Sequence, residues 1–197
     1  MWRNILIGIC IIGCVVGWGN TLWIKGKALL AQYLITSSWQ QTMIEGEPVK
    51  PWYWADTWPV AALSFPRQQI KLYALAGASG SSLAFGPGHV DGTALPGQEG
   101  TQIYSAHRDT HFQFIGELAI NDVIVVQAPD GTQQRFAVHQ TLVVNAHESA
   151  WEYDAQRNEI HLITCYPFNS ISPNPPQRFI VIGHLLPDHP DSLAPPA

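Results

Sequence analysis

The sequence predicts an all-β domain, either a sandwich or a barrel. Beyond Val60 the apolar residues recur with a period close to two, in short runs separated by Gly, Pro and Asp. Many short strands with few helices are typical of sandwiches and barrels. The chain has 197 residues, of which 46% are hydrophobic and 13% charged, and this is enough for one good core. We therefore expect one domain with attached segments.

Alternating apolar and polar residues give the expected strands. Their ranges are Ala61–Phe65, Gln69–Leu75, Thr101–His107, Asp122–Ala128, Thr132–Val144, Glu159–Cys165 and Arg178–Leu186. Pro129-Asp130-Gly131 predicts a tight hairpin, and a helical turn fits Phe112–Leu118. Gly and Pro crowd the segment Gly86–Gly100, so we expect an irregular surface loop there. The Pro-rich tail, Pro187–Ala197, is expected to be disordered.

Residues 1–24 are expected to form a transmembrane signal anchor. The run Ile5–Ile24 carries no charged side chain, and at about 1.5 Å per residue it reaches the roughly 30 Å of a bilayer core. A cleaved signal peptide is the alternative, but the bulky Trp18 makes a poor cleavage site. Charged residues flank the run on both sides, so charge alone does not decide its orientation.

Residues 25–58 are expected to link this anchor to the domain at 59–186. Gly26–Met43 resembles a mildly amphipathic helix. The following stretch, Glu45–Pro59, is rich in Pro and aromatic residues. An interfacial belt or a ligand groove is possible from composition, but the turn-like Ala55-Asp56-Thr57 favours a strap packed on the domain.

Charge excludes one class of function. The formal net charge is −5, and the ten Lys and Arg residues are scattered along the chain. A protein that binds nucleic acid needs a basic patch to neutralise phosphates. Nucleic-acid binding is therefore disfavoured.

The three cysteines fall into two groups. Cys10 and Cys14 lie on one helical face of the apolar run and are interpreted as small packing residues. Cys165 is alone, so no disulfide can form within the expected domain. A single thiol there is either a reactive group or a buried small hydrophobe.

A reactive thiol needs a base or cation beside it and a donor for the developing oxyanion. His107 ends one expected strand and Arg178 opens another. Polar residues at strand ends can converge on one rim of a small barrel, where such folds place their sites. Taken singly, a His at a strand end or an Arg before an apolar strand is more often an ordinary surface residue.

Several short motifs surround these candidate residues. They are His107-Arg108, Leu162-Ile163-Thr164-Cys165, Arg178-Phe179-Ile180-Val181, and the preceding Gly86-Pro87-Gly88-His89 with Gly92–Gly97. Together these motifs resemble those of the sortase family. The aromatic segment Pro51–Pro59 is similar to one seen in sortases of Gram-negative bacteria. The resemblance runs from about Pro51 to Leu186, with His161 standing where the family usually has Thr and Ala106 where many members have Gly.

This resemblance implies an eight-stranded sortase β-barrel with short helices and a transpeptidation reaction. Cys165 would be the nucleophile, His107 the acid and base, Arg178 the oxyanion donor that also positions the peptide, and Thr164 a residue bordering the substrate groove. The expected substrates are membrane-anchored proteins with a Leu-Pro-x-Thr-Gly-like signal, cut between Thr and Gly and transferred to an amine. No metal or cofactor is implied. The expected location is the bacterial inner membrane, as a single-pass protein with its catalytic domain in the periplasm.

Three alternatives remain open from the sequence. His107 and His111 have the i, i+4 spacing of a helical zinc pair, but the Glu of a zinc protease is absent after the first His. A cysteine hydrolase would use the same site with water as acceptor. A membrane-anchored, non-catalytic binding module would keep Cys165 for packing and use the aromatic segment to recognise a ligand.

Overall fold

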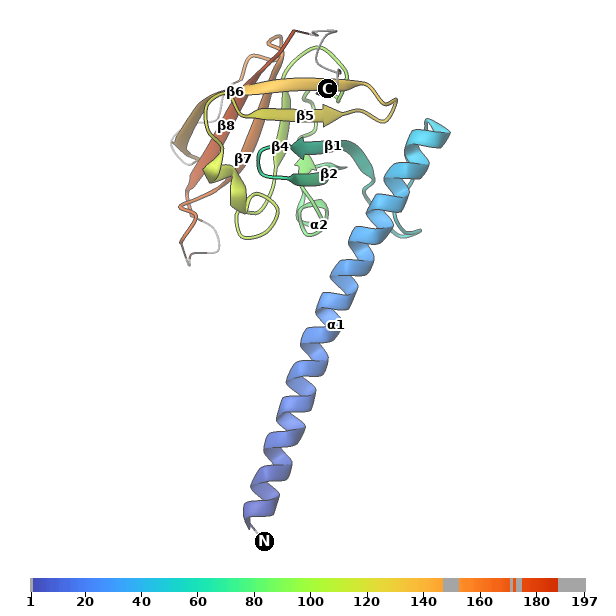
Figure 1. Cartoon of the computed structure of the whole chain (residues 1–197), viewed down its shortest axis with the longest axis vertical. Helices are drawn as coiled ribbons and strands as arrows, with labels where there is room; N and C mark the ends of the chain where they lie inside the picture. The colour runs from blue at the N-terminus through green and yellow to red at the C-terminus, as the bar shows by residue number, and fades with distance from the viewer. Residues whose placement is uncertain (1, 147–152, 171, 173–174, 188–197) are drawn as a thin grey trace, which may run out of the picture.

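The computed structural model describes residues 2–146, 153–170, 172 and 175–187 (Figure 1). A long helix, α1 (Trp2–Glu45), comes before all the strands. These are β1 (Pro59–Phe65), β2 (Ile70–Ala76), β3 (Gly88–His89), β4 (Gln102–Ser105), β5 (Val123–Gln127), β6 (Gln133–Asn145), β7 (Glu159–Tyr166) and β8 (Gln177–Leu185). The short helix α2 (Gly80–Leu83) follows β2, and the 3-10 helix η1 (Gln113–Glu117) follows β4.

The strands close into one barrel in the order β1-β2-β3-β4-β7-β8-β6-β5. Most neighbours are antiparallel, but β2 and β3 are parallel, and so are β4 and β7. Because the barrel is closed, each strand pairs with a neighbour on both sides over part of its length. The prediction of an all-β barrel is confirmed, and the barrel has a mixed sheet.

The barrel interior holds the apolar core. Its largest fully buried members include Tyr104, Phe65, Phe112, Phe136, Ile160 and Leu162. Removing such a side chain from water contributes about 1.5–3 kcal/mol. Leu162 on β7 and Val181 on β8 oppose each other in this core. Because side chains alternate along a strand, residues one position away from these two project to the outer face of the barrel.

The segment Gly86–Gly100 differs from the expected irregular loop. It contains β3, which pairs with β2 on one side and β4 on the other. Adding a Cβ to Gly88 would place it 2.4 Å from the carbonyl oxygen of Gly77, so glycine permits this close approach. A two-residue strand has no detectable period, and only its pairing partners identify it.

Helix α1 is continuous across the boundary expected between the anchor and the amphipathic helix. Ala31, Ile35 and Trp39 are buried against the barrel, and the ring of Trp39 lies 5.9 Å from that of Tyr73. The N-terminal part of α1 projects away from the barrel (Figure 1). Within the described residues, no helix combines the length and apolar character that crossing a membrane requires.

The aromatic segment packs on the barrel as a strap. Trp52 lies edge-on to Phe85 at 5.0 Å, and the buried Thr57 donates a hydrogen bond from Oγ1 to the carbonyl of Ala76 at 2.8 Å. Tyr53 and Trp54 remain exposed. The tail predicted to be disordered lies outside the described residues from 188 onward.

Candidate active site

The parallel pairing of β4 with β7 brings His107 beside Cys165. The paired positions run as far as Ser105 and Ile163. The pairing continues beyond the strand, because the N–H of Ala106 donates to the carbonyl of Ile163 at 3.2 Å. His107 is the next residue, and it lies at the level of Cys165. Strand β4 ends at Ser105, earlier than expected, so His107 begins the turn that follows.

The antiparallel pairing of β7 with β8 places Arg178 directly opposite Cys165. His107, just after β4, therefore lies in one row with Cys165 on β7 and Arg178 on β8. Cys165 and Arg178 share the outer face, since the inward positions are taken by Leu162 and Val181. Cys165 is half-buried and His107 is exposed, so a ligand can reach both.

Arg178 is held by the backbone that leads into β8. Its Nη1 donates to the carbonyls of Pro175 at 2.5 Å and Gln177 at 2.9 Å. A guanidinium carries five N–H donors in a rigid fork. These two bonds hold this fork at the end of β8, next to Cys165.

Thr164, which was expected to border the substrate groove, directly precedes Cys165 on β7. Its side chain is buried, and Oγ1 donates to the carbonyl of Ala106 at 2.7 Å. Because Thr164 alternates with Cys165, its side chain lies on the inner face. Its contact joins the end of β4 to β7 and so supports the position of His107.

The outer face beside Cys165 is apolar. Ile163 on β7 pairs with Ile180 on β8, and Leu142 and Val144 on β6 pair with Ile180 and Arg178. Paired residues on neighbouring strands project to the same face. Ile180 is fully buried, whereas Ile163, Leu142 and Val144 are partly exposed, so these three side chains near the thiol suit apolar side chains of a bound peptide.

The segment from His107 to His111 forms turns and not the helix that an i, i+4 zinc pair requires. Burial, and next the nearby His107, hold the pKa of His111 below its usual range. Among residues 2–146, 153–170, 172 and 175–187, no group of three or more His, Cys, Asp or Glu side chains could hold a metal ion.

Arg108, which the sequence indicates only as part of the His107-Arg108 motif, also belongs to the site. It follows His107, yet its side chain is only 4% exposed and bonds the loop between β7 and β8. The sequence gives no signal for this burial, because an Arg in a polar turn is ordinarily exposed.

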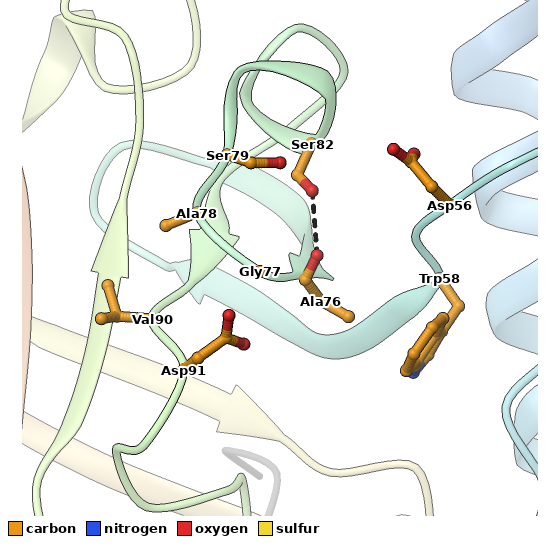
Figure 2. A pocket seen from close by; sticks show the side chains of 9 residues that line it. All are labelled: Asp56, Trp58, Ala76, Gly77, Ala78, Ser79, Ser82, Val90 and Asp91. Atoms are coloured by element: carbon orange, nitrogen blue, oxygen red, sulfur yellow. Dashed lines mark hydrogen bonds between the residues drawn. The ribbon is translucent and has the colours of Figure 1, made fainter.

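A separate pocket of about 620 Å³ lies beyond the ends of β2 and β3. Figure 2 shows the carboxylates of Asp56 and Asp91 and the ring of Trp58 around it, with Ser82 Oγ donating to the carbonyl of Ala76 at 2.9 Å. No thiol or imidazole lines the pocket.

Comparison with known proteins decides the family. The family model described as the sortase domain matches residues 63–186, well over half of the chain. The chain belongs to the sortase family. Sortases are cysteine transpeptidases, so an accessible thiol in a row with His and Arg is the arrangement in which to seek the chemistry.

Individual relatives agree with this membership. Sortase D of Bacillus subtilis (strain 168) is 30% identical over 121 residues, which are 61% of this chain and 61% of that protein. This sortase therefore matches about three fifths of the length of that relative. Sortase A from Corynebacterium diphtheriae has a TM-score of 0.61 at 25% identity, covering 71% of this chain and 66% of that one. Sortase C-1 from Actinomyces oris has a TM-score of 0.58 at 27% identity, covering 66% and 75%.

Proposed function

We propose that this sortase cleaves a Leu-Pro-x-Thr-Gly-like sorting signal between Thr and Gly and transfers the product to an amine acceptor. The observation that carries the proposal is the row of His107, which follows β4, Cys165 on β7 and Arg178 on β8. Membership of the sortase family supplies the reaction class.

In the first half of the reaction, the thiolate of Cys165 attacks the carbonyl carbon of the signal Thr. Arg178 stabilises the negative charge that develops on the carbonyl oxygen, and its position opposite Cys165 supports this role. His107 gives a proton to the glycine nitrogen as the C–N bond breaks. The products are a thioester on Cys165 and a free glycine amine.

In the second half, the acceptor amine attacks the thioester. His107 takes the proton released by this amine, and an amide replaces the thioester as Cys165 leaves as thiolate. All protons are accounted for within the site and no metal or organic cofactor takes part in either step. The partly exposed apolar side chains of Ile163, Leu142 and Val144 support recognition of the apolar part of the signal.

The proposed partners are membrane-anchored proteins that carry the signal, together with the amine acceptor. We place the enzyme at the inner membrane with its barrel facing the periplasm, because tethering enzyme and substrate to one surface raises their effective concentration. This placement is supported by the uncharged run Ile5–Ile24 of the sequence. Alkaline extraction of membranes tests it: release of the full chain into the supernatant would contradict an integral anchor.

Mass spectrometry of the purified full chain tests the chemistry. The protein is incubated with a Leu-Pro-x-Thr-Gly peptide library, with and without added amines, and a thioacyl adduct on Cys165 that resolves to a new amide is expected. An adduct that resolves only to free acid would replace the transferase by a cysteine hydrolase. Absence of any adduct on folded protein would overturn the proposal in favour of a binding module.

A further inference from the structure

We propose that Arg108 is a positioning residue that fixes His107 and the loop between β7 and β8 relative to each other. The inference rests on the proposed function, because it concerns the geometry of the same site. Arg108 follows His107 directly, and its side chain is 4% exposed. Its guanidinium contacts the loop that follows β7, just beyond Cys165.

Three backbone carbonyls of this loop accept hydrogen bonds from Arg108. Nη1 donates to Pro167 at 2.8 Å, and Nη2 donates to Ser170 at 2.6 Å and Ser172 at 2.7 Å. These contacts join residues about sixty positions apart in sequence, since Arg108 and Ser170 are 62 apart. A single side chain therefore ties the His107 turn to the first half of the loop that leads from Cys165 to Arg178.

Hydrogen bonds to these three carbonyls stabilise the buried positive charge of Arg108. A buried charge is costly unless it is paired or fully hydrogen-bonded. Its ion pair with Asp109 at 3.0 Å involves a carboxylate that is 69% exposed, and such a partner contributes little. The planar fork of Arg reaches several acceptors at once, whereas the single ammonium of Lys does not match this geometry.

The rest of the loop is fastened independently. An added Cβ on Gly116 would lie 2.7 Å from the ring of Phe168, so this ring packs directly on η1. At the other end of the loop, Arg178 bonds the carbonyl of Pro175. In the described part of the loop, Arg108 and η1 hold its first half and Arg178 bonds its last residues.

The test compares Arg108→Gln and Arg108→Lys with wild type and with two control variants. Arg157→Gln removes an exposed arginine that pairs only with surface or half-buried carboxylates. Arg67→Gln breaks the pair with the buried Asp122 and serves as a control for general loss of stability. A His107→Ala variant supplies the reference for a thiol without its imidazole neighbour.

Two measurements need no substrate. Amide exchange of peptides spanning 167–172 is expected to accelerate in Arg108→Gln and less in Arg108→Lys, and to stay unchanged in the controls. The pH profile for iodoacetamide alkylation, read at the Cys165 peptide, is expected to move toward that of His107→Ala only in the Arg108 variants. Faster exchange with an unchanged alkylation profile would overturn positioning, because Arg108 would then hold the loop alone.

Turnover gives the third measurement. Arg108→Gln is expected to lower kcat about 10²-fold, as for a small misplacement of reacting groups, with little change in KM, and Arg108→Lys should fall between it and wild type. Equal losses in Arg108→Gln and Arg67→Gln would overturn the inference in favour of a stability effect. If wild type forms no thioacyl adduct, the proposed function fails, while exchange and alkylation still decide whether Arg108 positions His107.

Discussion

Cys165 and Arg178 occupy directly opposite positions on the antiparallel strands β7 and β8. The same β7 strand is paired in parallel with β4, and this pairing brings His107 to the other side of Cys165. The hydrogen bonds that close the barrel therefore also assemble the site. Its geometry depends on register, since a slip of one residue would move Cys165 to the inner face.

Replacement of Cys165 by Ala is expected to abolish cleavage of a sorting peptide, because the chain would lose its nucleophile. Cys165 is half-buried and belongs to no disulfide, so the free energy of unfolding should change by no more than about 0.5 kcal/mol. Peptide cleavage assays and urea unfolding measure the two quantities. Retained cleavage by the variant would remove Cys165 from the nucleophile role.

Replacement of Arg178 by Lys is expected to lower the cleavage rate at least about 10²-fold, as for loss of an oxyanion donor. Lys keeps the charge but loses the planar fork that now bonds Pro175 and Gln177. Single-turnover formation of the thioacyl adduct measures the step. Arg157→Lys is the matched control, and a near-normal rate for Arg178→Lys would assign oxyanion stabilisation to another group.

Replacement of Thr164 by Val removes the bond from Thr164 Oγ1 to the carbonyl of Ala106 while keeping the side-chain shape. The expected loss is about 1–2 kcal/mol of unfolding free energy, because a buried acceptor loses its donor. Urea unfolding measures it, with the exposed Thr141→Val on β6 as control. Equal stability of the two variants would show that the pairing of β4 with β7 does not depend on this bond.

Replacement of Gly116 by Ala is expected to displace Phe168, whose ring would lie 2.7 Å from the new Cβ. Overpacking of this kind costs about 1–3 kcal/mol, and the loop movement should also lower the cleavage rate. Gly80→Ala is the control, because nothing lies within 4 Å of its added Cβ. Indistinguishable rates for Gly116→Ala and wild type would show that the loop can move without disturbing the site.

Acid should destabilise the fold through His161. Burial, only partly offset by Glu159, holds the pKa of His161 below its usual value near 6.5. The unfolded chain therefore takes up the proton first, and stability declines as pH falls below about 6.5 until the folded side chain is also protonated. Unfolding free energies at pH 7.5 and 5.5 should differ less in His161→Gln than in wild type.

The exposed His184→Gln variant is the control for this experiment. It should keep the pH dependence of wild type. If His161→Gln showed the full wild-type decline, the acid sensitivity would have to come from other groups. His111 is one of these, since burial also lowers its pKa.

Alternation of apolar residues was enough to predict the strands of the barrel, because that alternation is what burial of one face demands. It failed at β3, where two residues carry no period, and at the His107 end of β4, where pairing stops before the polar turn. It also separated α1 into two segments at a point where the helix continues without a break.

For the site, the sequence likewise predicts some features and not others. The lone Cys165 of the domain, and the His and Arg at strand ends, are visible in the sequence because residue type and position suffice to nominate them. Strand register decides that they share one row. Burial of Thr164 and the hydrogen bonds of Arg108 to the β7–β8 loop are seen only in the folded structure. These are contacts between residues far apart in the chain, and no local pattern encodes a pairing that only the closed barrel creates.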